Sequence, residues 1–294
     1  MSGTLYIVAT PIGNLEEITP RASQVLSEVD LIAAEDTRTT GLMLNLLNIE
    51  TAKLIAYHKF NENARQNLLL EKLRTGQNIA LVSDAGTPCI SDPGFMLVRT
   101  AADAGIPVVG ISGPCAVTVA LSVSGFPAEP FLFVGFLPRK TGAIVDVLMP
   151  LSLIHGPTLV FYESPKRIAA TVELLAVNFP KILLCLCNDL TKKFERIYRG
   201  TPSEVLEALQ ANPHTEKGEY TCVAYLPALS QEDASAEPEE NAGSAPVLES
   251  LLVDTMIKSN CSIKEAIQIL SSNIKDKSKK EIYAASLRLK ELLS

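Results

Sequence analysis

Short apolar runs alternate with amphipathic segments along the first 125 residues, and this alternation constrains the fold more than any other feature. The apolar runs are Leu5–Val8, Leu31–Ala34, Leu54–Tyr57, Ile79–Val82 and Val108–Ile111. Helices are expected at Pro20–Glu28, Gly41–Leu47, Ala64–Arg74, Phe95–Ala104 and Ala116–Ser122. Apolar strands joined by helices are typical of a parallel sheet covered on both faces. The sequence therefore predicts an α/β domain with a parallel five-stranded sheet over residues 1–125.

The second half has a different order of elements and predicts a second α/β domain over residues 126–228. Strands are expected at Phe131–Val134, Thr158–Tyr162, Lys181–Cys187, Phe194–Arg199 and Tyr220–Tyr225. Helices are expected at Ile144–Leu148, Pro165–Asn178 and Ser203–Ala211. Two of the strands follow one another without a helix between them, which favours a mixed sheet.

The charge balance is acidic but uneven. The formal net charge is −7, so no global basic field attracts nucleic acid. Residues 229–246 carry five acidic side chains and no Lys or Arg, which predicts a disordered acidic linker. Residues 247–294 carry eight basic and six acidic side chains, giving +2, and predict a small three-helix C-terminal module at 247–258, 263–270 and 278–293. Ser262 and Ser278 each precede a Glu by three positions, as in a capping box.

Neither a metal site nor a membrane segment is expected. The six Cys form no C-x-x-C pair and the three His are scattered, so we expect reduced thiols in a cytoplasmic protein and no metal. The N-terminus lacks the basic start and apolar core of a signal peptide. Residues 104–128 are uncharged, but the Gly and Pro residues among them favour a buried strand, a loop and a helix over a membrane span.

A loop rich in Gly and Pro follows the fourth predicted strand. Residues Ser83–Gly94 contain two Gly, two Pro, two Asp, two Ser and one Thr. Gly allows a ligand to approach the backbone closely, and Pro fixes the shape of the loop. Open α/β sheets bind their ligands at the carboxyl ends of strands. The loop is therefore predicted to bind a ligand, although an elaborate loop without one is the alternative.

Four further polar clusters should meet this loop at one rim of the sheet. They are Thr10–Asn14, Glu35–Thr40, His58–Glu62 and Ser112–Ala116. Arg38 beside two carboxylates suits the binding of a phosphate or hydroxyl group, but Asp36 would equally cap a helix. His58 is either a rim residue with a function or an ordinary histidine.

In the second half, Ser164 and Pro165 are a good helix cap and first-turn pair. Glu219 is either an edge charge or a ligand for substrate. No G-x-G-x-x-G follows the first strand and no G-x-x-x-x-G-K-[ST] occurs, which disfavours a Rossmann dehydrogenase and a P-loop NTPase. The sequence leaves open a ligand that contains an adenosine half but no phosphates.

Taken together, these segments resemble the tetrapyrrole methylase superfamily, and within it the members that methylate 16S ribosomal RNA. The resemblance spans about residues 3–226. It is carried by Ala9–Leu15, Ala34–Arg38, Tyr57–Glu62, Ser83–Gly94, Ile111–Pro114, Gly135–Pro138, Phe161–Pro165 and Lys193–Glu195. The start Thr10-Pro11-Ile12-Gly13 differs from the glycine-rich start of corrin-pathway relatives, which argues against a tetrapyrrole substrate. Two further departures are the acidic spacer and Lys166, where relatives often have His.

The resemblance implies a homodimeric enzyme that binds S-adenosylmethionine in a cleft between the two α/β domains. It also implies methyl transfer, without a metal, to the ribose 2′-hydroxyl of a cytidine in the decoding centre of the 30S subunit. The expected cofactor-binding residues are Asp84, Gly86, Thr87, Ile90, Ser91, Ser112 and Pro114. The expected substrate-binding and proton-handling residues are Glu35, Asp36, Arg38, His58, Asn61 and Lys193, among which the sequence does not identify the base.

Two other classes of function stay open at this point. One is a methyltransferase of the same fold that acts on a tetrapyrrole carbon or a protein amine. The other is a nucleotide-binding or RNA-binding module without catalysis. The density of polar residues at one rim favours catalysis, and four basic residues of the last predicted helix favour RNA as the substrate: Lys279, Lys280, Arg288 and Lys290.

Overall fold

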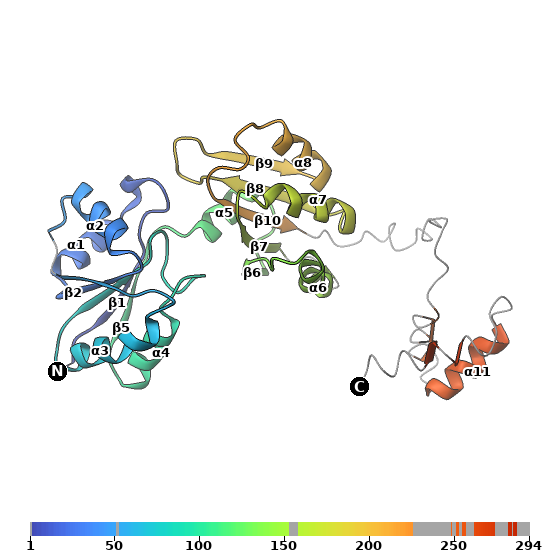
Figure 1. Ribbon diagram of the computed structural model, residues 1–294, viewed down its shortest axis with the longest axis horizontal. Coiled ribbons are helices and arrows are strands. Elements are labelled where there is room, and N and C mark those ends of the chain that lie inside the picture. Colours follow the sequence, from blue (N-terminus) through green and yellow to red (C-terminus); the bar gives the residue numbers. More distant parts are fainter. Residues whose placement is uncertain are drawn as a thin grey trace. The chain divides into compact units, whose positions relative to one another are not determined.

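The computed structural model describes residues 2–50, 53–152 and 158–225, and in the C-terminal part 248, 251–252, 255–256, 262–273, 282–283 and 285–286. The chain divides into two compact units, residues 1–228 and 229–294. The first unit contains two five-stranded sheets with helices packed against them (Figure 1). This confirms the predicted α/β class, with a parallel sheet followed by a mixed one.

The first sheet is parallel and has the strand order β3-β2-β4-β1-β5. Its strands are β1 (Leu5–Val8), β2 (Leu31–Ala34), β3 (Lys53–Ala56), β4 (Ile79–Val82) and β5 (Val108–Ile111). The central strand β4 is buried at every position, and its Leu81 lies opposite Ile7 of β1 and Ala33 of β2. Parallel order brings the polar segments that follow these strands to one edge of the sheet.

Two pairs of helices cover the two faces of this sheet (Figure 1). On one face, α1 (Pro20–Glu28) and α2 (Thr37–Leu46) bury Leu26 and Leu44, and the short 3-10 helix η1 (Leu15–Glu17) precedes them. On the other face, α3 (Glu62–Arg74) and α4 (Phe95–Asp103) bury Leu73 and Leu97. Helices therefore enclose the apolar strands on both faces, as the alternation of strands and helices in the sequence predicts.

Helix α5 (Ala116–Ser124) packs against the second sheet. The sequence places this segment in the first domain, but its Val117 and Leu121 are buried together with Val160 and Val223 of the second sheet. The polypeptide thus passes to the second sheet at the start of α5. The predicted domain boundary at residue 125 stays a prediction.

The second sheet is mixed and has the strand order β6-β7-β10-β8-β9. Its strands are β6 (Phe131–Phe136), β7 (Thr158–Glu163), β8 (Leu183–Asn188), β9 (Arg196–Gly200) and β10 (Tyr220–Tyr225). Only the β6–β7 pair is parallel. Helices α6 (Thr141–Ser152), α7 (Ile168–Asn178) and α8 (Pro202–Gln210) pack on the face opposite α5.

Helix α7 begins three residues later than the sequence predicts. The carbonyl of Ser164 accepts from the N–H groups of Arg167 (3.0 Å) and Ile168 (3.1 Å), so residues 165–167 form a separate turn. Ser164 therefore does not cap the helix with its side chain. Ser164 and Pro165 therefore precede the helix, directly after the end of β7.

In the second unit, α11 (Ile263–Asn273) confirms the predicted second helix of the C-terminal module. Its predicted capping box is also confirmed, because the amide and hydroxyl of Ser262 donate to the Glu265 carboxylate at 2.8 and 2.7 Å. Leu252, Leu270 and Ile282 are buried together in this unit. The predicted linker at 229–246, the Ser278 cap and most of the other two predicted helices lie outside the described residues.

Candidate functional site

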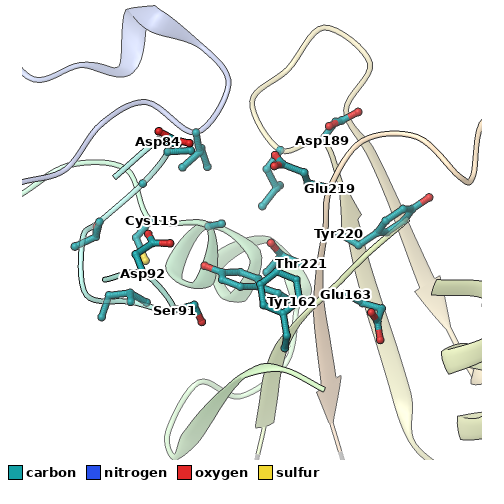
Figure 2. A pocket seen from close by; sticks show the side chains of 18 of the residues that line it. Asp84, Ser91, Asp92, Cys115, Tyr162, Glu163, Asp189, Glu219, Tyr220 and Thr221 are labelled. Atoms are coloured by element: carbon teal, nitrogen blue, oxygen red, sulfur yellow. The ribbon is translucent and has the colours of Figure 1, made fainter. Parts of the chain in front are cut away.

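A cavity of about 440 Å³ lies where the carboxyl ends of the first sheet's strands meet the second sheet. Figure 2 shows Asp84 and Asp92 on one wall, Asp189 and Glu219 on the other, and Tyr162 between them. The first wall comes from loops after β1, β2 and β4 and from the start of α5. The second wall comes from β7, β10, the end of β6 and the β8–β9 loop. The volume lies in the range typical of small-molecule sites, about 300–1,000 Å³.

Residues 83–94, here the β4–α4 loop, form much of the first wall. Thr10 and Gly86 exchange backbone hydrogen bonds of 2.9 and 3.0 Å, which attach the loop to the end of β1. Gly86 has φ +78°, and Cys89 and Ser91 have φ near +70° despite their side chains. Left-handed backbone at residues other than Gly is uncommon and is concentrated at functional sites. The loop therefore has a specific shape that its contacts maintain.

Five of the seven predicted cofactor-binding residues line the cavity, and all five belong to the β4–α4 loop. They are Asp84, Gly86, Thr87, Ile90 and Ser91. The other two, Ser112 and Pro114, do not line it. Pro114 supports the site from behind, because its carbonyl accepts from the Thr87 hydroxyl at 3.1 Å. Ser112 is exposed, and its carbonyl accepts from the hydroxyl of Thr19 at 3.5 Å.

Three carboxyl groups, those of Glu35, Asp84 and Asp92, lie on the first wall. The N–H of Asp36 donates to Asp84 Oδ1 at 3.0 Å, and the N–H of Asp84 donates to Glu35 Oε2 at 3.4 Å. Burial raises the pKa of each of the three carboxyl groups. The pKa of Asp92 reaches about 6, because the charges of Glu35 and Asp84 add to the effect of burial. Such a wall favours a positively charged ligand.

Asp36 and Arg38, both predicted site residues, form an ion pair outside the cavity lining. Arg38 Nη2 lies 2.6 Å from Asp36 Oδ2, and this guanidinium holds the pKa of Asp36 well below its usual range. Asp36 Oδ1 also accepts from the N–H of Arg38 at 2.8 Å, so α2 begins at Thr37 and not at the predicted Gly41. The side chain of Arg38 is 90% exposed. Of the predicted Glu35–Arg38 cluster, only Glu35 lines the cavity.

His58 and Asn61 lie in the turn after β3 and also do not line the cavity. Asn61 Oδ1 accepts from the N–H of His58 at 2.9 Å, which is a local turn contact. The neighbouring Glu62 accepts from the Tyr57 hydroxyl and from the N–H of Gly94, each at 3.0 Å. Through Glu62, this turn fixes the far end of the β4–α4 loop.

On the second wall, Lys192 lies between two carboxylates. Its Nζ is 2.9 Å from Asp189 Oδ1 and 2.7 Å from Glu219 Oε2. Burial lowers the pKa of Lys192, but the hydrogen bonds to Glu219 and Asp189 outweigh that effect, so the pKa is raised overall. Asp189 and Thr191 have φ values of +52° and +67°, so the turn that presents Lys192 is strained. Because its pKa is raised, Lys192 stays protonated at neutral pH.

The sequence predicted Lys193 as a substrate-binding or proton-handling residue, but Lys193 is absent from the cavity lining and its neighbour Lys192 is part of it. Lys193 is exposed, and its Nζ lies 5.7 Å from the centre of the Phe194 ring. The N–H of Thr191 donates to Glu195 at 2.6 Å, which keeps this segment in a loop, and β9 begins at Arg196 instead of Phe194. No sequence signal distinguishes two adjacent lysines at the start of an expected strand.

Aromatic side chains of the second sheet also line the cavity. The ring of Tyr162 is 5.0 Å from that of Phe133 and 5.5 Å from that of Phe136, between centroids. Tyr162 and Phe136 both line the cavity, as does Thr221 of β10. The sequence prediction of the site named none of these three residues. Tyr162 and Thr221 belong to expected apolar strands, and Phe136 follows the expected strand Phe131–Val134, in a segment that served only for the family resemblance.

The lining suits a small cation that carries an aromatic ring and no phosphate. Carboxylates lie on both walls, and Lys192 is the one basic side chain among the described residues that line the cavity. Both partners of Lys192 are acidic, so it adds little net positive charge. Within the described residues, no group of three or more His, Cys, Asp or Glu could hold a metal ion, and no helix is long and apolar enough to cross a membrane.

Comparison with known proteins places these features in a family. The family model described as "Tetrapyrrole (Corrin/Porphyrin) Methylases" matches residues 4–206. A protein of Escherichia coli O157:H7 named "Ribosomal RNA small subunit methyltransferase I" is 46% identical over 236 residues, which are 80% of this chain and 82% of that protein. A Neisseria meningitidis protein of the same name is 36% identical over 290 residues, 99% of this chain and 95% of its own length.

Solved structures show the same fold at lower identity. Diphthine synthase matches with a TM-score of 0.57 and 14% identity, over 75% of this chain and 89% of its own. Uroporphyrin-III C-methyltransferase from Thermus thermophilus, "complexed with S-adenyl homocysteine", matches with a TM-score of 0.51 and 20% identity, over 75% of this chain and 97% of its own. The fold is therefore shared among enzymes with different substrates. By the matched family model and by its relatives, the chain belongs to the tetrapyrrole methylase family and, within it, to the ribosomal RNA small subunit methyltransferases I.

Proposed function

We propose that this protein methylates the ribose 2′-hydroxyl of a cytidine in the decoding centre of 16S ribosomal RNA. As a member of its family, it is an S-adenosylmethionine-dependent methyltransferase of small-subunit ribosomal RNA. The observation that carries the proposal is the 46% identity, over 80% of the chain, to a protein named "Ribosomal RNA small subunit methyltransferase I". The position and atom that receive the methyl group are the proposed part, and they come from the family resemblance.

The cavity between the two sheets is the proposed site of the methyl donor. Thr87, Ile90 and Ser91 of the β4–α4 loop would hold one side of it, and Tyr162 and Thr221 the other. The carboxylates of Asp84 and Asp92 would attract the positive charge of the sulfonium. S-adenosylmethionine supplies an activated methyl group and a neutral thioether as the leaving group, so the chemistry requires no metal.

The protein's contribution to the rate would be alignment and removal of one proton. Holding both reactants in line can supply about 7–11 kcal/mol of the barrier. We infer that Glu35 takes the proton of the ribose hydroxyl, because it is the one predicted proton-handling residue that lines the cavity. Burial raises the pKa of Glu35 toward neutrality, which is favourable for a general base.

The remaining predicted substrate residues would contact RNA outside the cavity. Asp36, Arg38, His58, Asn61 and Lys193 are absent from its lining. Arg38 is the best suited of them to hold a phosphate, since its side chain is 90% exposed. We also propose, from the resemblance alone, that the enzyme is a homodimer in the cytoplasm. Sedimentation velocity of the purified protein tests the first of these two points.

The experiment that tests the function uses 30S subunits and S-adenosylmethionine labelled in its methyl group. We expect the label in 16S RNA, at one cytidine. The phosphodiester bond that follows this nucleotide should resist cleavage by alkali, as it does after a 2′-O-methyl nucleotide. Separate reactions with a porphyrinogen and with total protein as acceptors test the two other substrate classes of this fold. Label in either of them, or at a base atom of the RNA, would contradict the proposal.

A further inference from the structure

Phe136 is a large apolar side chain that is 61% exposed although it lines the cavity. It lies at the end of β6, an edge strand of the second sheet. The pairing of β6 with β7 shifts register between Phe133 and Phe136, and Gly135 between them has φ +66°. Such irregularities re-aim side chains next to functional sites. The backbone here departs from a regular strand, and Phe136 is the cavity-lining residue next to that departure.

Contacts on both sides of Phe136 hold the backbone of β6 in this irregular conformation. A β-carbon on Gly135 would lie 3.1 Å from Ser91 Oγ, so the backbone of β6 is packed closely against the β4–α4 loop. After Phe136, the Arg167 guanidinium donates to the carbonyls of Leu137 (3.3 Å) and Pro138 (2.6 Å). Arg167 is itself paired with the buried Glu163 at 3.3 Å. The position of the exposed ring is thus supported by polar contacts that do not involve the ring.

Among the described residues, the Phe136 ring packs against one other aromatic ring, and much of its surface is exposed. Its centroid is 5.5 Å from that of Tyr162, at an interplanar angle of 59°. Tyr162 is in turn supported by Phe133 at 5.0 Å. An aromatic ring fixed in this way, with more than half of its surface exposed, offers a stacking surface to a planar ligand.

The charges around the ring decide which part of an RNA can reach it. Glu35, Asp84 and Asp92 lie on one wall, Asp189 and Glu219 on the other, and Lys192 is paired with the latter two. Phosphate groups are repelled by this lining, whereas a base carries no charge. Proteins that bind single-stranded RNA stack its bases on aromatic side chains, and this contact does not depend on the sequence.

We propose that Phe136 is the stacking surface for the base of the nucleotide that receives the methyl group. The inference rests on the proposed function, since it requires an RNA substrate. The base would leave its own stack and lie on the Phe136 ring at the mouth of the cavity, with its ribose directed inward. Stacking on Phe136 would then replace the phosphate contacts that the acidic walls prevent.

The test compares Phe136→Ala with Phe136→Trp in steady-state methylation of 30S subunits. We expect the KM for subunits to rise roughly 5- to 150-fold in Phe136→Ala, the range expected for loss of one stacked base. Phe136→Trp keeps an aromatic ring at this position, so its KM for subunits should stay close to the wild-type value. The affinity for S-adenosylmethionine, measured by calorimetry, should stay within twofold in both variants. The loss should be equal at 50 and 200 mM salt, because stacking releases no counterions.

Phe131→Ala is the matched control. Phe131 is on the same strand and is 44% exposed, but it does not line the cavity, so its replacement should leave both constants unchanged. An unchanged KM for Phe136→Ala, with an active wild-type enzyme, would overturn this inference and leave the proposed function intact. A parallel loss of donor affinity would also overturn it, because the ring would then serve the donor. A wild-type enzyme that labels no RNA would overturn the proposed function, and this inference with it.

Discussion

The side-chain stem of Lys192 packs against Gly13 and occupies the space that a β-carbon on residue 13 would need. Gly13 belongs to the segment after β1 and Lys192 to the β8–β9 loop, so this contact joins the two walls. The Leu190 carbonyl would also lie only 3.2 Å from such a β-carbon. The absence of a side chain at residue 13 therefore allows the Lys192 ammonium to reach Asp189 and Glu219.

Replacing Gly13 by Ala should displace Lys192 and separate it from its two carboxylates. We expect affinity for S-adenosylmethionine to fall about tenfold, corresponding to about 1.4 kcal/mol, as expected for a disturbed charged contact. Calorimetry measures this change. Gly110→Ala is the control, since nothing lies within 4 Å of a β-carbon there. Equal donor affinity in the two variants would contradict a role of this contact in the site.

Gly86→Ala tests whether the β4–α4 loop binds the donor. A β-carbon at Gly86 would lie 3.3 Å from Ile12 Cγ2, and φ is +78°. The backbone strain costs about 1 kcal/mol, and the new methyl group narrows the cavity. Gly125→Ala introduces a similar strain at φ +79°, with nothing within 4 Å of its β-carbon. We expect both variants to lose similar stability in urea unfolding, and only Gly86→Ala to lose donor affinity.

Glu35→Gln tests the assignment of the base. The amide keeps the shape of the side chain but cannot take a proton, so we expect kcat to fall about 10²- to 10⁴-fold. Donor affinity should change by no more than a few-fold, because Asp84 and Asp92 remain. Glu173→Gln, an exposed position on α7, is the control. A kcat within threefold of the wild type would exclude Glu35 as the base.

Asp92 should make stability depend on pH. Its pKa is about 6 in the folded protein against an ordinary value of 3.8, because burial and the charges of Glu35 and Asp84 disfavour its ionised form. Between pH 4 and 6 the folded state therefore holds a proton that the unfolded chain has released, so the free energy of unfolding falls as pH rises through this window.

Asp92→Asn removes this titration. The variant should be more stable than the wild type above pH 6, and the difference should vanish below pH 4, as measured by urea unfolding from pH 3.5 to 8. Asp146→Asn, at an exposed position on α6, should show no such difference. A stability difference for Asp92→Asn that is constant over the whole range would refute the raised pKa.

The architecture of the first unit could be predicted from the sequence because each strand is a short apolar run with clear boundaries. The expected Pro20–Glu28 helix is observed with the same ends, since Thr19 accepts from the N–H of Ala22 and Pro20 is the first helical residue. Contacts between distant segments could not be predicted. Helix α5 is apolar along most of its length, so its pattern did not indicate which sheet it would cover.

The site could be predicted where a single loop forms it, and not where two walls meet. Asp84 and Thr87 line the cavity because the β4–α4 loop does so as a whole. Lys192 and Tyr162 come from the second sheet, and only the packing of the two sheets brings them opposite that loop. Asp36 had two interpretations, as a helix cap and, together with Arg38, as part of a site for a phosphate or hydroxyl group. Its Oδ1 accepts from the N–H of Arg38, which confirms the cap, whereas the second interpretation stays a prediction.

The C-terminal unit is proposed to contact the ribosomal subunit. Residues 1–228 form a compact unit of their own, so a protein that ends at Ala245 should keep its fold and its donor affinity. Residues 247–294 carry a formal charge of +2, and residues 229–246, the predicted linker, carry −5. Phosphate contacts made by Lys and Arg weaken steeply with salt. The truncated enzyme should therefore bind 30S subunits more weakly at low salt. Each phosphate that the truncated enzyme no longer neutralises should make the slope of log K against log salt shallower by roughly 0.7.

The alternative for this unit is a small helical bundle that packs on the second copy of the chain, because a charge of +2 is a weak field. The two possibilities differ in what truncation changes. If the unit serves only the dimer, truncation should lower the sedimentation coefficient by more than the smaller mass explains and leave the salt slope for 30S binding unchanged. Neutralising Lys279, Lys280, Arg288 and Lys290 as Gln in the full chain separates the two further, since it should reproduce the shallower slope while keeping the full-length sedimentation behaviour. An unchanged slope in both proteins would rule out RNA contact by this unit.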